Sequence, residues 1–171
     1  MKERTGVVTF KGGPLTLVGP ELHVGDKAPE FAALGNDLQP VSLSSFKGRK
    51  VILSSVPSLD TPICDLQTRR FNKEAEQLGA DVPVLTISMD LPFAQARWCG
   101  AAGAKNVRTL SDHRDAAFGQ AYGLLIKELR LLARAVVIID REGMVRYVQL
   151  VKEVAQEPDY DDALRALAKI S

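Results

Sequence analysis

Cysteine and histidine are scarce in this chain of 171 residues. It has two cysteines, Cys64 and Cys99, and two histidines, His23 and His113. Two cysteines are too few for a disulfide scaffold, and they do not form a C-x-x-C pair. The four residues also lack the spacing that is typical of a zinc site. The composition therefore argues against a disulfide-stapled module and gives no indication of a bound metal.

Long apolar runs and a charge imbalance are absent as well. The longest runs, such as 135–139, are far too short to span a bilayer. The charged start, residues 1–5, is not followed by the apolar segment of a secretory signal. A formal net charge of +1 and the lack of like-charged blocks give no reason to expect nucleic acid or a membrane as partner. We therefore expect a cytoplasmic protein.

The remaining composition is that of an ordinary globular protein. Hydrophobic residues make up 46% and charged residues 25% of the chain. A chain of 171 residues can bury one large core, and no repeat, linker or low-complexity segment divides it. The sequence predicts a single domain over residues 1–171.

The most informative stretch runs from a predicted strand into a predicted helix. Val51–Val56 is short, mostly apolar and rich in β-branched residues, and Pro57 ends it. Thr61 is a good N-cap and Pro62 suits the first helical position. Cys64 then lies in the first turn, where the helix dipole and unpaired N–H groups favour a thiolate. The alternative is a small buried hydrophobic residue, and position alone does not decide between them.

From this stretch onward the pattern alternates between strands and helices. The order of the expected strands and helices indicates an α/β protein with a thioredoxin-like fold. In this fold a central mixed sheet is flanked by helices, and here an N-terminal β-hairpin precedes it. The expected elements are a hairpin at 6–18, a strand pair at 31–43, a strand at 51–56, a helix at 62–78, a strand at 82–88, a helix at about 91–102 capped by Asp90, a strand at 107–110, a helix from 111 or 112 to 122, strands at 135–139 and 144–151, and a helix at 159–169 with Leu164 and Leu167 inward.

The order of residues around Cys64 resembles a known family. Pro-x-x-x-Thr-x-x-Cys resembles the peroxidatic motif of the peroxiredoxins, and the fuller string 58–64 is similar to that of the bacterial thiol peroxidases. The similarity extends from about Val8 to Ala168. Three further segments carry it: Asp90–Gly100, Leu132–Asp140 and Glu157–Tyr160.

The resemblance implies a role for each of five residues. Cys64 would attack a hydroperoxide as thiolate and become a sulfenic acid. Thr61 would hydrogen-bond the sulfur or the peroxide, and Pro57 would shield the sulfur from water. Arg134 would favour the thiolate and hold the leaving oxygen. Cys99 would be the resolving cysteine that forms an intramolecular disulfide with Cys64.

Each of these residues also has a purely structural interpretation. Thr61 would then be only a helix N-cap, worth about 1 kcal/mol. Pro57 would only terminate a strand, and Cys99 would be a core residue of an amphipathic helix. Arg134 would stand at a strand end and reach solvent, which the residues alone favour because buried charges are rare.

The resemblance also implies partners. It indicates an atypical two-cysteine peroxiredoxin that takes hydroperoxide substrates, is reduced by thioredoxin or a similar reductant, and forms a homodimer. It implies no metal, haem or flavin cofactor. Two departures bear on the pocket: the stretch between Tyr122 and Arg134 is short and poor in glycine, and Val56 stands where phenylalanine is frequent.

Two other functions are compatible with the same residues. One is a general thiol–disulfide oxidoreductase, which the lack of C-x-x-C disfavours. The other is a peroxide sensor whose disulfide alters a partner surface. Turnover with a recycling reductant distinguishes an enzyme from a sensor, and reduction of insulin would identify the oxidoreductase.

Overall fold

The computed structural model describes residues 1–171 and is built around a seven-stranded mixed sheet. The strands follow the order β11-β10-β5-β6-β7-β3-β4. The three central strands β5, β6 and β7 run parallel to one another. On one side β10 is antiparallel to β5 and β11, and on the other β3 is antiparallel to β7 and β4. This confirms the predicted α/β fold. The bounds are β3 (Ala32–Leu34), β4 (Pro40–Ser42), β5 (Val51–Ser55), β6 (Val84–Ser88), β7 (Val107–Ser111), β10 (Ala135–Ile139) and β11 (Val145–Leu150).

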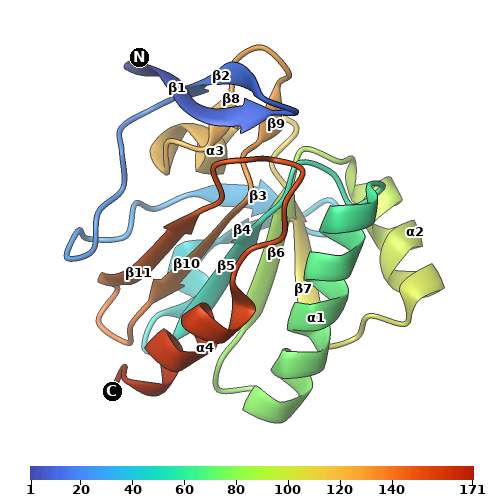
Figure 1. Cartoon of the computed structure of the whole chain (residues 1–171). Helices are drawn as coiled ribbons and strands as arrows, with labels where there is room; N and C mark the ends of the chain where they lie inside the picture. Colours follow the sequence, from blue (N-terminus) through green and yellow to red (C-terminus); the bar gives the residue numbers. More distant parts are fainter.

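The central sheet is covered on both faces. Every residue of β5, β6 and β10 is buried, which explains their almost uninterrupted apolar sequences. Neighbouring residues of β5 point to opposite sides: Ile52 belongs to the buried cluster that includes Phe71 and Ala163, and Leu53 belongs to the cluster that includes Phe118. Figure 1 shows α1 and α4 side by side on one face of the sheet. The helices are η1 (Leu43–Phe46, 3-10), α1 (Pro62–Leu78), α2 (Pro92–Ala102), α3 (Ala117–Ala121) and α4 (Tyr160–Ala168).

A second, smaller sheet lies at one end of the molecule, near α3 (Figure 1). It contains β1 (Glu3–Phe10), β2 (Gly13–Val18), β8 (Leu125–Ile126) and β9 (Leu131–Leu132) in the order β1-β2-β8-β9. The predicted N-terminal hairpin is therefore confirmed. The sequence did not predict β8 and β9, because two-residue strands are too short to show an alternating pattern.

The segment after β7 differs from its prediction. The sequence predicts a helix from residue 111 or 112 to residue 122, but α3 contains only Ala117–Ala121. Ala116 has a left-handed backbone conformation (φ 51°), which interrupts a right-handed helix. The Asp112 carboxylate accepts two backbone N–H groups of α3, at 3.0 and 2.8 Å. Asp112 therefore accepts the otherwise unpaired N–H groups at the start of a short helix, and no long helix begins at Asp112 itself.

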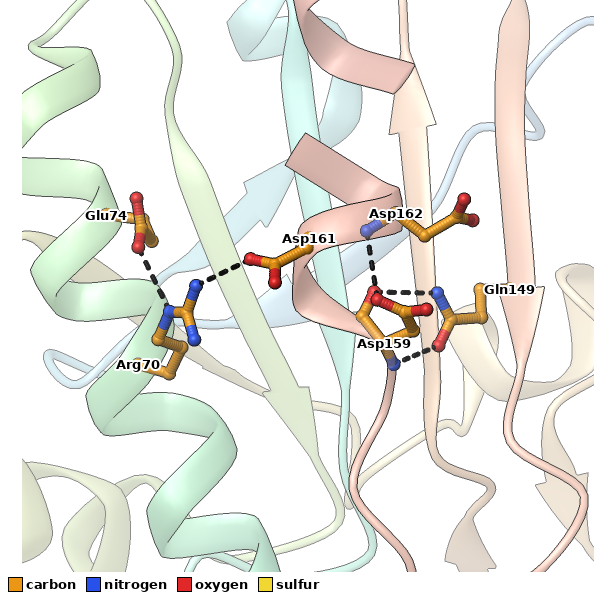
Figure 2. Close-up of polar contacts among 6 residues, drawn as sticks. All are labelled: Arg70, Glu74, Gln149, Asp159, Asp161 and Asp162. Carbon is orange, nitrogen blue, oxygen red and sulfur yellow. Dashed lines mark hydrogen bonds and ion pairs between the residues drawn. The ribbon is translucent and has the colours of Figure 1, made fainter. Parts of the chain in front are cut away.

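Helix α4 is held at its first turn. Asp159 is its N-cap and accepts the N–H of Asp162 at 3.0 Å. Gln149 of β11 makes two further bonds to the backbone of Asp159, and Arg70 of α1 pairs with Asp161 at 3.1 Å (Figure 2). The last predicted helix is thus confirmed, with one detail corrected. Its buried residues are Ala163 and Leu167, whereas Leu164 is half-buried.

Candidate active site

Cys64 lies in the first turn of α1, where the sequence predicts it. Thr61 is the N-cap, Pro62 is the first helical residue, and the helix extends to Leu78 as predicted. The Cys64 side chain is completely buried. The unpaired N–H groups and the positive end of the helix dipole surround this turn, so a negative charge on the sulfur is favoured there.

Arg134 makes direct contact with the Cys64 sulfur. Its Nη2 donates to Cys64 Sγ at 3.2 Å, its Nη1 to Gln67 Oε1 at 2.9 Å, and its Nε to the Val154 carbonyl at 3.0 Å. Only 2% of Arg134 is exposed, which excludes the alternative of an arginine that reaches solvent. The sequence placed Arg134 beside the thiolate through the resemblance, and the structure brings the two together.

No carboxylate compensates the charge of Arg134. Its contacts are one carbonyl, one neutral amide and the sulfur of Cys64, and it takes part in no salt bridge. A buried cation is costly unless an anion is close by. The one group in contact with it that can become an anion is the thiol of Cys64. The guanidinium and a Cys64 thiolate therefore stabilise each other.

Gln67 holds the guanidinium in place and was not singled out by the sequence. It is fully buried, its Oε1 accepts from Arg134, and its Nε2 donates to Ser54 Oγ of β5 at 2.8 Å. The available signal was its spacing, because residues three apart lie on the same face of a helix. A glutamine three positions after Cys64 on the buried face of α1 is therefore aligned with the sulfur.

Thr61 stands at the N-cap position without making the expected cap bond. Its side chain accepts no N–H of α1. Its hydroxyl instead donates to the Ser58 carbonyl at 3.0 Å, and the residue is exposed. The interpretation of Thr61 as a helix cap alone is therefore wrong, because the hydroxyl oxygen remains available to accept from another molecule.

An apolar enclosure surrounds the Cys64 sulfur. Val56, Leu59 and Cys64 form a small buried cluster, against which Trp98 of α2 packs. Pro57, which lies between Val56 and the loop that leads to α1, is also buried, and β5 ends at Ser55. This enclosure limits the access of water to the sulfur. A thiolate in low dielectric interacts more strongly with Arg134 than it would in solvent.

Cys99 occupies a separate environment. It lies on α2, is half-buried, and its sulfur is 3.6 Å from Thr109 Oγ1 of β7. Both cysteines are free thiols in this structure. Cys64 contacts the residue preceding β10 and Cys99 contacts β7, and these strands are three places apart in the sheet. Each sulfur therefore has a partner of its own, and the two sulfurs form no disulfide in this structure.

Asp90 has a role that the sequence did not predict. It was expected to cap α2, but the N-cap is Leu91 and no side chain caps this helix. The Asp90 carboxylate instead accepts from the Leu59 N–H at 2.8 Å and from the hydroxyls of Ser58 and Ser88, both at 2.7 Å. It therefore anchors the loop that precedes Thr61, including the carbonyl to which Thr61 donates.

Asp90→Asn is expected to loosen this loop. An amide offers one acceptor oxygen in place of two, so one of three donors loses its partner, at a cost of about 1–3 kcal/mol. For a chain of this size the unfolding temperature should fall by about 2–10 °C. The resemblance implies that Cys64 reacts with peroxide, and the second-order rate of that reaction should fall by about tenfold, since displacement of aligned groups slows a reaction. Stopped-flow kinetics and thermal unfolding measure the two effects.

Asp26→Asn is the matched control, because Asp26 also accepts a backbone N–H, that of His23 at 2.8 Å, but in an exposed loop. Its effect on the rate should be negligible. An Asp90→Asn variant whose rate equals that of the parent would contradict the anchoring role.

The segment Glu157–Tyr160, which leads into α4, packs against α1. The Tyr160 ring packs edge-on against Phe71 at 5.6 Å between centroids, and its hydroxyl donates to Glu157. Burial raises the pKa of Tyr160, as does the bond to Glu157, whereas the charges of Arg134 and Arg70 act in the opposite direction.

Neither a membrane span nor a metal cluster accompanies this site. None of the helices combines the length and apolar character needed to cross a bilayer. Likewise, no set of three or more His, Cys, Asp and Glu side chains is arranged to hold a metal ion.

Comparison with known proteins places the chain among thiol-based redox proteins. Residues 23–164 match the Redoxin family. A thiol peroxidase of Bacillus subtilis (strain 168) is 58% identical over 165 residues, which cover 95% of this chain and 98% of the relative. A thiol peroxidase of Staphylococcus aureus (strain MRSA252) is 53% identical over 163 residues, with 95% and 98% coverage.

Solved structures agree with this result. A peroxiredoxin-like protein from Aquifex aeolicus superposes with a TM-score of 0.90 at 46% identity, over 97% of this chain and 96% of that one. A thiol peroxidase from Chromobacterium violaceum has the same fold, with a TM-score of 0.84 at 22% identity over 95% of each chain.

The fold and the buried thiol–arginine pair thus define a peroxiredoxin-type redox protein. The chain belongs to the Redoxin family and, within it, to the thiol peroxidases. Its activity is the thiol-dependent reduction of peroxide.

Proposed function

We propose that Cys64 is the thiol that reacts with peroxide. The observation that carries this proposal is the buried guanidinium of Arg134, which contacts Cys64 Sγ at 3.2 Å and has no carboxylate partner. The thiolate attacks one oxygen of the O–O bond, so an S–O bond forms while the O–O bond breaks. The departing oxygen takes a proton and leaves as water or an alcohol, and Cys64 becomes a sulfenic acid.

Three neighbouring groups assist this step. Arg134 stabilises the thiolate before the reaction and the negative charge on the departing oxygen during it. The Thr61 hydroxyl donates to Ser58, so its oxygen can accept the O–H of a hydroperoxide and orient it. Pro57 is buried beside the turn and restricts water. We therefore assign Cys64, Arg134, Thr61 and Pro57 to the peroxidatic centre.

Cys99 is the proposed resolving cysteine. Its thiolate attacks the Cys64 sulfenic sulfur, an S–S bond forms, and the S–O bond breaks with release of water. A disulfide needs Cα atoms within about 7 Å, so the first turn of α1 must open for the two residues to meet. Thioredoxin or a similar dithiol protein then reduces the disulfide. We further propose that the protein acts in the cytoplasm, as a homodimer.

Peroxide consumption coupled to NADPH through thioredoxin and its reductase tests this cycle. We expect sustained turnover with hydrogen peroxide and organic hydroperoxides. A single oxidation event without recycling would favour a peroxide sensor. Reduction of insulin, with no peroxide consumption, would favour a general thiol–disulfide oxidoreductase.

The connectivity of the disulfide is tested by mass. One equivalent of peroxide added to the reduced protein should give a monomeric chain that is lighter by two hydrogens, because both cysteines lie in one chain. Mass spectrometry under non-reducing conditions measures this directly. A covalent dimer as the main product would show instead that the disulfide links two subunits.

A further inference from the structure

A hydrogen bond joins the residue after Cys64 to the residue before Cys99. Trp98 Nε1 donates to Asp65 Oδ1 at 2.8 Å, and it is the one hydrogen bond between α1 and α2. The second carboxylate oxygen, Oδ2, accepts from Arg69 Nε at 2.8 Å. The Arg69 guanidinium lies over the Trp98 ring, 5.7 Å from its centroid. We call these three residues the Asp65–Trp98 clasp.

The clasp holds the arrangement in which the two sulfurs are apart. Cys64 contacts Arg134, and Cys99 contacts Thr109 on β7. To meet Cys99, the first turn of α1 must leave its helical conformation, and Asp65 belongs to that turn. Its backbone dihedral angles change with those of Cys64, so the carboxylate cannot stay in line with the Trp98 N–H. Breaking the clasp is therefore part of the barrier to disulfide closure.

The rest of α1 is held by a different set of contacts. Arg70 pairs with Glu74 at 3.0 Å and with Asp161 at 3.1 Å, as Figure 2 shows, and lies over the Tyr160 ring at 5.0 Å. Phe71, the next residue, is fully buried. These contacts attach α1 to α4 from Arg70 onward and do not involve α2. Opening is thereby confined to the turn that carries Cys64 and the clasp.

We propose that Trp98 and Asp65 are positioning residues that set the rate of disulfide closure. By holding the first turn of α1 in its helical form, the clasp keeps the Cys64 sulfenic acid away from Cys99 and lengthens its lifetime. A second peroxide can then oxidise it to sulfinic acid before water is released in disulfide formation. The clasp therefore sets the peroxide concentration at which the enzyme inactivates itself. This inference rests on the proposed Cys64–Cys99 disulfide.

Trp98→Phe removes the donor and retains most of the ring that packs against Val56, Leu59 and Cys64. It should accelerate closure by about three- to tenfold, the range expected for one hydrogen bond to a partly exposed carboxylate. The first reaction with peroxide is followed separately, so that closure is timed from the formation of the sulfenic acid in each variant. Because Trp98 is the only tryptophan, rapid acid quench, alkylation of free thiols and mass spectrometry replace fluorescence as the readout.

A double-mutant cycle isolates the bond itself. Asp65→Ala should also accelerate closure, and the double variant with Trp98→Phe should close no faster than the faster single variant. In each variant the peroxide concentration that half-inactivates the enzyme during turnover should rise by the factor by which its closure is accelerated. Tyr147→Phe is the matched control, because it removes an aromatic donor to Asp162 (2.6 Å) between β11 and α4, and its closure rate should equal that of the parent.

Two results would overturn the proposed role of the clasp while leaving the proposed chemistry intact. One is that Trp98→Phe closes at the parental rate. The other is that it closes more slowly, which would mean that the hydrogen bond holds the two segments in a position that favours closure. A parent protein that never loses two hydrogens on oxidation would instead refute the Cys64–Cys99 pairing and the clasp with it. The mass of the oxidised parent therefore separates the two failures.

Discussion

Replacing Cys64 by serine is expected to abolish peroxide turnover. A hydroxyl is not ionised at neutral pH and does not attack an O–O bond at a useful rate, and no other thiol touches Arg134. We expect the NADPH-coupled rate to fall to that of the assay without enzyme, a loss of at least a thousandfold. The substitution is close to isosteric, so circular dichroism and thermal unfolding should show a folded protein.

Cys99→Ser is the matched comparison, because it removes the other thiol from a neighbouring helix. It should retain the first, rapid reaction with one equivalent of peroxide and then stall under thioredoxin. The sulfenic acid on Cys64 would persist and become overoxidised as more peroxide is added. Recycling of Cys99→Ser by thioredoxin at the parental rate would show that Cys99 is not the resolving cysteine.

The sequence predicts best where local signals and tertiary packing agree. Helix α1 begins at Pro62 and ends at Leu78 as expected, since an N-cap residue, a proline at the first position and a glycine at the end all mark the same bounds. The buried strands β5, β6 and β10 were likewise recognisable from short apolar runs bounded by turn residues. These elements place Cys64, so its position could be predicted from the sequence.

Prediction failed where one side chain has several possible hydrogen-bond partners. Asp90 precedes a helix and matches a cap, yet its carboxylate binds a loop 31 residues earlier in the chain. Thr61 has the cap position, but its hydroxyl donates to a carbonyl. Asp112 accepts N–H groups of α3 although Ala116, in a left-handed conformation, separates it from that helix. Such choices depend on which donors the fold brings near, and local sequence does not contain that information.

The environment of the thiol was only partly predictable for the same reason. The residues alone favoured an Arg134 that reaches solvent, because a buried guanidinium is costly. The resemblance to the peroxiredoxins pointed to the sulfur instead, and the burial of Arg134 agrees with that. Gln67 could not be assigned in advance, since a glutamine on a helix is usually solvated. Its role becomes visible when Arg134 and Ser54 are found on either side of it.

Arg134→Met is expected to leave the protein folded and to slow its reaction with peroxide by about 10²–10³-fold, the typical effect of removing a donor that stabilises developing negative charge. Methionine fills much of the volume of the arginine side chain and takes an uncompensated charge out of the core, which offsets the loss of the bonds to Gln67 and Val154. The free energy of unfolding should therefore change by no more than about 2 kcal/mol.

The charge of Arg134 and the thiolate of Cys64 stabilise each other, so the same substitution should also slow the alkylation of Cys64. Iodoacetamide reacts with the thiolate, which loses a charge-assisted hydrogen bond when the guanidinium is removed, so the alkylation rate of Cys64 at neutral pH should fall. Arg130→Met is the control, because Arg130 lies on the same segment but is exposed and has no contact with the sulfur. Its alkylation rate should match that of the parent. If Arg134→Met were alkylated at the parental rate as well, the helix start alone would be sufficient to activate Cys64, and Arg134 would act only on the departing oxygen.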